Sequence, residues 1–169
     1  MNNQAFIDGQ NLTLSTRYDQ DPWKIDLYKF RKYLKEKYNI SRAYYFLGYR
    51  NDEHLKLYNR IRNSGFILVF RVHNEQLESN KKGNVDTDIV FMMMKSFHEK
   101  DDSNKIFLVS GDGDYYRTII YLKRHGRLGK VLFPAHFRAS SLYRHFSDYY
   151  YDYLDNPIIR KKIELKEQK

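Results

Sequence analysis

The sequence contains no cysteine. That absence excludes disulfide bonds, thiol nucleophiles and zinc sites built from thiolates. No stretch approaches the roughly 20 consecutive apolar residues that a membrane-spanning helix needs. The chain starts Met-Asn-Asn-Gln-Ala-Phe-Ile-Asp, which has neither the basic start nor the apolar core of a secretion signal. We therefore expect a cytoplasmic protein with no membrane segment.

An excess of positive charge is the main bias among the residues that are present. The 169 residues, enough for one domain with a core of ordinary size, carry 30 Lys and Arg against 21 Asp and Glu, a net charge of +9. A basic surface attracts polyanions, and nucleic acid is the commonest one in a cell. The 16 tyrosines can stack on unpaired bases. A lysine-rich, AT-biased proteome would give the same composition, so both explanations stay open.

Short apolar runs alternate with segments of helical spacing along the chain. They predict strands at 4–7, 43–47, 66–72, 106–109 and 130–133, and helices at 23–38, 53–63, 85–98, 115–125, 140–146 and 158–169. Asp21, before a proline, predicts the start of the first helix, and Tyr149–Tyr151 are expected to pack at an edge strand. This alternation favours an α/β fold with a mainly parallel sheet. We expect one domain over residues 1–156 and a basic helical tail over residues 157–169.

Aspartates stand at the exits of two predicted strands and at the start of one predicted helix. They are Asp8, Asp86, Asp88, Asp112 and Asp114. Ligands bind at the carboxyl ends of the strands in open α/β sheets, and clustered carboxylates suit a hard divalent cation such as Mg²⁺ or Mn²⁺. Such a cation offsets the repulsion among the acids and activates water for attack on a phosphate. Each acid alone also fits a turn or a helix cap, but their joint occurrence favours a shared metal site.

The spacing of the acids ranks them as ligands. Asp86 and Asp88 are two residues apart, so they cannot share one helix face. Asp86 shares its face with apolar residues, which makes it the preferred ligand and leaves Asp88 as the second choice. Asp112 is the preferred direct ligand of its pair, with Asp114 binding through water or capping the helix. Gly9 is expected to permit a tight turn after Asp8.

Three motifs carry a resemblance to a known family. They are Ile7-Asp8-Gly9-Gln10-Asn11, Lys82-Gly83-Asn84-Val85-Asp86-Thr87-Asp88 and Ser110-Gly111-Asp112-Gly113-Asp114-Tyr115. In order and spacing they resemble the NYN domain family, a branch of the PIN-like nucleases, over about residues 5–155. The resemblance implies a Rossmann-like three-layer α/β/α sandwich and a Mg²⁺- or Mn²⁺-dependent ribonuclease that binds RNA. A homodimer is an open alternative for its assembly.

The resemblance also implies roles for individual residues. Asp8, Asp86, Asp112 and Asp114 would form the catalytic, metal-binding cluster. Asn11 would steady the first turn or the substrate, and Ser110 would orient an acid. Ser140 and Ser141 resemble a family turn near the active edge.

Basic residues near these motifs are candidates for holding a substrate phosphate. They are Lys82, with its neighbour Lys81, Arg117 and Arg138. The plain alternative for each is an ordinary solvated surface side chain.

One departure from the family pattern favours an alternative function. Many relatives carry a further acid one or two turns into the helix after the middle motif, whereas here Met92–Met94 stand there and the next acid is Glu99. The alternative is a catalytically weak or inactive RNA-binding module on the same scaffold. Other metal-phosphate enzymes fit less well. A Toprim site needs glutamate at the position of Asp8, a haloacid-dehalogenase phosphatase needs an acid at Gln10, and no Walker phosphate loop is present.

Overall fold

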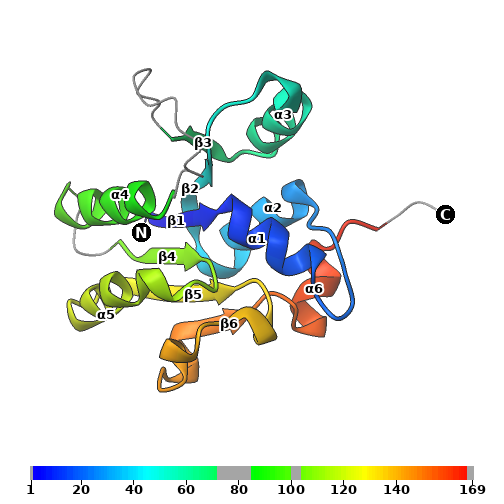
Figure 1. The fold of residues 1–169 in the computed structure, drawn as a ribbon. Coiled ribbons are helices and arrows are strands. Elements are labelled where there is room, and N and C mark those ends of the chain that lie inside the picture. Colours follow the sequence, from blue (N-terminus) through cyan, green and yellow to red (C-terminus); the bar gives the residue numbers. More distant parts are fainter. Residues whose placement is uncertain (1, 72–84, 100–103, 167–169) are drawn as a thin grey trace.

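The computed structural model describes residues 2–71, 85–99 and 104–166. In this part of the chain, six strands form one sheet in the order β3-β2-β1-β4-β5-β6, and every neighbouring pair is parallel (Figure 1). The strands are β1 Asn3–Asp8, β2 Ile40–Leu47, β3 Ile67–Phe70, β4 Ile106–Val109, β5 Leu128–Phe133 and β6 Tyr151–Tyr153. The prediction of a mainly parallel sheet is confirmed.

Helices cover both faces of this sheet (Figure 1). They are α1 Gly9–Arg17, α2 Leu27–Tyr38, α3 Leu55–Asn63, α4 Asp86–Glu99, α5 Tyr116–Arg124 and α6 Pro157–Ile163. One apolar core joins the sheet to α1, α2, α3 and α6, and a second core joins it to α4 and α5. Two cores on either side of one sheet make the Rossmann-like three-layer α/β/α sandwich that the sequence predicts.

The order in which the strands are added to the sheet reverses between β1 and β4. These strands are hydrogen-bonded neighbours, yet α1 leaves β1 toward one core whereas the helical segment after β4 packs into the other. A crevice opens where two connections diverge in this way, at the carboxyl ends of the strands. The fold therefore offers a binding site between the ends of β1 and β4.

Helix α1 is the main element that is not predicted from the sequence. A tight turn was expected at Gly9, but the helix begins there, capped by Asp8, whose Oδ1 accepts from the Asn11 N–H at 2.9 Å. Glycine is needed for close approach, since a Cβ would lie 2.3 Å from a Tyr45 ring carbon and 2.7 Å from the Phe46 carbonyl oxygen. The polar composition of α1, rich in Asn, Thr and Ser, hides it from propensity arguments.

Three other predicted boundaries were wrong. Helix α2 starts at Leu27 and is capped by Asp26, whose Oδ1 accepts from the Lys29 N–H at 3.0 Å, so Asp21 is not its start. The helix expected at 140–146 is a single 3₁₀ turn over Ser141–Tyr143. The helix expected from 158 ends at Ile163, and Glu164 then bridges to Ile25.

Helix α6 packs against the body of the fold rather than standing apart. Its Ile163 is fully buried in the first core, and its Arg160 guanidinium lies 5.2 Å from the centre of the Trp23 ring. The division at residues 156 and 157 stays a prediction. Within the described ranges, none of the helices has the length and apolar character needed to cross a bilayer.

Candidate metal centre

The first acid of the site lies at the end of β1. Asp8 is 4 % exposed and caps α1 through the Asn11 N–H. The Asn11 side chain then bridges to the next strand, because its Oδ1 accepts from the Gly111 N–H at 2.9 Å. Asn11 therefore ties the end of β1 to the turn after β4 and fixes the width of the crevice between them.

The turn after β4 carries two more acids. Asp112 caps a 3₁₀ turn over Gly113–Tyr115, its Oδ1 accepting from the Asp114 N–H at 3.0 Å. The buried Ser110 Oγ accepts from the Asp112 N–H at 3.2 Å, so Ser110 orients the backbone of this acid. Asp112 is half-buried whereas Asp114 is exposed. Of the two, Asp112 is the cap, and its carboxylate keeps a second oxygen for other partners.

The third element of the site is the start of α4, on the other side of the crevice. Oxygens of Asp86, Asp112 and Asp114 all lie within 4.8 Å of one another, a spacing that could hold a metal ion. Asp88, half-buried on the same first turn, is not a member of this group among the residues that the structure describes. Asp8 lines the same cleft as Asp86 and Asp112.

Tyr115 joins Asp8 to this group and was not singled out from the sequence. Its fully buried hydroxyl donates to Asp8 Oδ2 at 3.2 Å and also to Asp86 Oδ1. A phenol has one proton, so it can donate to only one of the two carboxylates at a time. Burial, and then the Asp8 charge, raise the pKa of Tyr115, which keeps it a donor. Two carboxylates beside one neutral donor favour a cation nearby.

The raised pKa of Asp8 also favours a cation at this site. Burial raises the pKa of the Asp8 carboxyl, and the negative charges of Asp86 and Asp112 raise it further. The Asn11 N–H and the Tyr115 hydroxyl each lower it, but the net pKa is raised. A cluster in which one acid resists ionisation is balanced when a divalent cation supplies positive charge.

The predicted substrate residues fall into three groups. Ser140 lies against the acidic turn, since its N–H donates to the Gly111 carbonyl at 2.9 Å and its Oγ is 2.6 Å from where a Gly113 Cβ would stand. Arg138 precedes it, Ser141 opens the next 3₁₀ turn, and Arg117 lies in the first turn of α5; these three are exposed. Lys82 and Lys81 lie outside the described residues.

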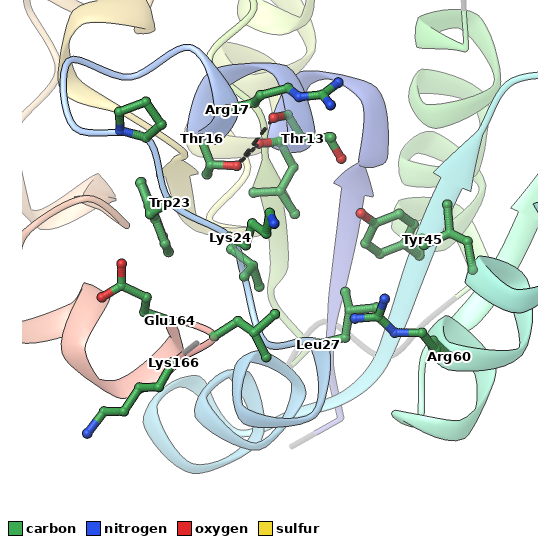
Figure 2. A pocket seen from close by; sticks show the side chains of 15 residues that line it. Thr13, Thr16, Arg17, Trp23, Lys24, Leu27, Tyr45, Arg60, Glu164 and Lys166 are labelled. Carbon is green, nitrogen blue, oxygen red and sulfur yellow. Dashed lines mark hydrogen bonds between the residues drawn. The ribbon is translucent and has the colours of Figure 1, made fainter. Parts of the chain in front are cut away.

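The cleft is small beside a second hollow in the same molecule. The cleft measures about 230 Å³ and is lined by Asp8, Gln10, Asn11, Leu14, Val85, Asp86 and Asp112. The larger cavity, about 1030 Å³, lies on another face of α1, where Tyr45 and Arg60 stand across from Trp23 and Glu164 (Figure 2). Its one acid, Glu164, is already engaged by Arg160 at 2.8 Å. The carboxylates of the candidate metal site therefore lie in the smaller hollow.

Comparisons with known proteins agree with this fold. A protein of unknown function from Vibrio parahaemolyticus has a similar solved structure, with a TM-score of 0.75, 18 % sequence identity, and coverage of 96 % of this chain and 94 % of that one. No curated protein matches the chain. The model of the NYN domain matches residues 4–155. The chain therefore belongs to the NYN domain family, within the PIN-like nuclease superfamily.

Proposed function

We propose that this protein is a divalent-metal-dependent endoribonuclease that hydrolyses RNA phosphodiester bonds. The observation that carries the proposal is the convergence of three aspartates within 4.8 Å, with Asp8 joined to them through Tyr115, at the crevice between β1 and β4. Membership of a nuclease superfamily supports it. The net charge of +9 favours a polyanionic substrate.

The cation is proposed to be Mg²⁺ or Mn²⁺. Asp8, Asp86, Asp112 and Asp114 would hold it, with Asp88 as a second choice, and all of these offer only carboxylate oxygens, the donors that hard cations prefer. When bound, such a cation supplies Lewis-acid activation of water and stabilises the charge that develops on the phosphate. The raised pKa of Asp8 and the shared Tyr115 proton are properties of this chain that fit such a centre.

The surrounding residues would orient the acids and the strand to be cut. Tyr115 fixes the directions of the Asp8 and Asp86 carboxylates, and Asn11 fixes the distance between the two strand ends. Arg138 and Arg117 are proposed to contact RNA phosphates, as is Lys82. Ser110 and Ser140 hold the acidic turn in place. The chain needs no covalent nucleophile for this reaction.

The test is hydrolysis of RNA by the purified protein with and without Mg²⁺ or Mn²⁺. The wild type should cut single-stranded or structured RNA only when a divalent cation is present, and Asp8→Asn should abolish cutting while it preserves the helix cap, because Asn caps helices as well as Asp does. Glu36→Gln is the matched control, since Glu36 is an exposed acid of α2 and the cleft is lined by no residue of that helix. A wild-type protein that leaves both kinds of RNA intact with either cation would refute the proposal.

A second candidate is an RNA-binding module without catalysis. The observation that favours it is the apolar run Phe91–Met94 in α4, where no acid follows Asp88 before the end of the helix at Glu99. This candidate predicts salt-sensitive RNA binding that survives Asp8→Asn. Cytoplasmic location and assembly as a homodimer stay predictions.

A further inference from the structure

The large cavity is a second hollow of the size that organic ligands occupy. Its volume of about 1030 Å³ is close to the upper end of the range for ligand pockets, about 300–1,000 Å³. Helices α1, α2 and α3, strand β2 and residues 22–25 and 164–166 all line it (Figure 2). Among the described residues, it shares no lining residue with the acidic cleft. A ligand in the cavity would therefore leave the cleft open.

The lining of the cavity is mainly apolar. Leu12 is buried, Ile25 and Leu27 are half-buried, and Leu57 and Leu165 are 40 % and 36 % exposed. Aliphatic side chains from several separate parts of the chain thus face one hollow. A ligand body that displaces water from them is favoured by the hydrophobic effect, by about four-fold in affinity for each CH₂ group that it buries.

The polar groups of the lining are already engaged or are shielded. The Thr13 and Thr16 hydroxyls donate to backbone carbonyls of α1 at 2.8 Å and 3.1 Å. The Tyr45 hydroxyl is hydrogen-bonded to Thr13, and the Trp23 indole nitrogen is buried out of reach of solvent. These groups offer little to a ligand with polar edges, such as a nucleobase, which would lose its hydrogen bonds to water on entry. The lining therefore favours an apolar ligand body.

The charged residues of the cavity are almost all cations, and these cations are exposed. They are Arg17, Lys24, Arg60 and Lys166. In the part of the chain that the structure describes, no carboxylate forms an ion pair with Arg17, Arg60 or Lys166. The one acid of the lining, Glu164, is held by the Arg160 guanidinium at 2.8 Å. This local excess of positive charge selects a ligand with a negative head group.

We propose that this cavity binds a small amphipathic anion, an aliphatic chain that ends in a carboxylate. The chain would lie against Leu12, Ile25, Leu27 and Leu57, and the carboxylate would meet the exposed cations, of which Arg60 stands beside Tyr45 (Figure 2). A guanidinium suits this role, because its planar fork matches the two oxygens of a carboxylate. The site needs no metal, and it adds a ligand of another chemical class to the proposed hydrolysis of RNA.

The experiment is isothermal titration calorimetry of the full chain with octanoate and decanoate, below the concentrations at which they form micelles. Decanoate should bind about 16-fold more tightly than octanoate, because it buries two more CH₂ groups at about four-fold each. Decylammonium has the same chain length and the opposite charge, and it should bind at least about ten-fold more weakly than decanoate because the cations repel it. AMP should bind more weakly than decanoate, because its base has polar edges.

Two matched pairs of variants on α3 locate the site. Leu57→Asp should weaken decanoate binding by at least about ten-fold, because it removes apolar surface and repels the carboxylate. Leu55→Asp is its control, since Leu55 is 45 % exposed on the same helix and outside the cavity lining. Arg60→Gln should weaken binding by about three-fold, the effect of one exposed ion pair. Arg62→Gln is its control, since Arg62 is exposed on another face of α3 and outside the lining.

Several results would overturn the inference. They are a dissociation constant of the wild type for decanoate weaker than about 1 mM, equal affinities for octanoate and decanoate, or equal affinities of the Leu57→Asp and Leu55→Asp variants for decanoate. Displacement of decanoate by an equal concentration of AMP would also overturn it, because that result would identify a nucleotide as the better ligand. None of these measurements involves RNA hydrolysis, so the outcome for the cavity is separate from the outcome for the acidic cleft.

Discussion

Two hollows lie on different faces of α1, and they differ in size and in charge. The cavity of about 1030 Å³ is lined by apolar side chains and by the cations Arg17, Lys24, Arg60 and Lys166, with Glu164 paired to Arg160 (Figure 2). The cleft of about 230 Å³ is lined by Asp8, Asp86 and Asp112, and the first two share the phenolic proton of Tyr115. Volume alone would direct attention to the cavity. Convergence of several carboxylates on one small cleft, with the pKa of Asp8 raised, marks the cleft instead.

The largest expected difference between the two hollows is in RNA hydrolysis. Asp112→Asn should lower the rate by at least about 10³-fold, equivalent to about 4 kcal/mol of transition-state stabilisation, because it removes a charged oxygen from the cluster and keeps the cap of the 3₁₀ turn. Glu164→Gln changes an acid of the cavity and should alter the rate by less than about two-fold, as for a substitution away from the reacting groups. Single-turnover rates at saturating Mn²⁺ make the comparison. Equal losses in the two variants would refute the assignment of the cleft.

Gly9 lies between the two hollows, and its close packing can be tested by measuring the free energy of unfolding of a variant. Gly9→Ala would place a Cβ 2.3 Å from the ring of Tyr45, which lines the cavity, and next to Asp8, which lines the cleft. We expect a loss of about 2–3 kcal/mol of unfolding free energy from this overpacking, measured by urea denaturation. Gly48→Ala is the matched control and should leave stability nearly unchanged, since nothing lies within 4 Å of its added Cβ. A normal Gly9→Ala variant would show that α1 can shift away from β2.

A pair of tyrosines gives the next comparison, one from each hollow. Tyr115→Phe removes the donor shared by Asp8 and Asp86, and it should lower the hydrolysis rate by about 10- to 100-fold, as for other residues that orient metal ligands. Tyr45 faces the cavity, and burial raises its pKa to about 12, so it too stays protonated. Tyr45→Phe should cost about 1 kcal/mol of stability and leave the rate unchanged, because its hydroxyl is hydrogen-bonded to Thr13 and Asp8 acts on it only through its charge. Similar rates for the two variants would remove Tyr115 from the site.

The sequence is sufficient to predict strands β1 to β5 and the acids, because both depend on strongly patterned residues. Strand β6, Tyr151–Tyr153, is not among the predicted strands. Buried parallel strands read as apolar runs, and an aspartate directly after such a run must lie at the carboxyl edge. Ile106–Val109 shows this, since the predicted strand and the observed β4 have the same bounds. The positions of Asp8, Asp86 and Asp112 around one crevice follow from that topology.

The features that the sequence does not predict depend on contacts between residues far apart in the chain. Nothing in the sequence distinguishes Tyr115 from the other 15 tyrosines, and only the fold shows that its hydroxyl lies between two acids. Helix α1 is specified by the Asp8 cap and by close packing of Gly9 on β2 rather than by propensity. The Arg138 guanidinium lies over the Tyr18 ring, although no local pattern connects the two surface turns that carry them. Such features need three-dimensional proximity, which spacing along one chain cannot supply.

The smallest expected effect is a change in the free energy of unfolding, and its sign should differ between the two hollows. Without a divalent cation, Asp8→Asn should raise the unfolding free energy at neutral pH by about 1 kcal/mol, or about 2–4 °C in Tm, because the raised pKa of Asp8 means that its ionised form opposes folding. Glu164→Gln should lower stability by up to about 1 kcal/mol, since it weakens a half-exposed pair with Arg160. Calorimetry in EDTA measures both shifts.

The pH dependence of the same experiment tests the cause. A carboxyl whose folded pKa lies above its unfolded value of about 3.9 favours folding while it is protonated, and that contribution is lost as the pH rises through the folded pKa. The advantage of Asp8→Asn should therefore be absent below about pH 4 and should grow as the pH rises toward neutrality. Saturating Mg²⁺ should reverse the order, because a ligand that binds only the folded wild type stabilises it. An Asp8→Asn variant that is less stable at neutral pH in EDTA would mean that the capping bond and the Tyr115 bond to Asp8 outweigh burial and the repulsion from Asp86 and Asp112.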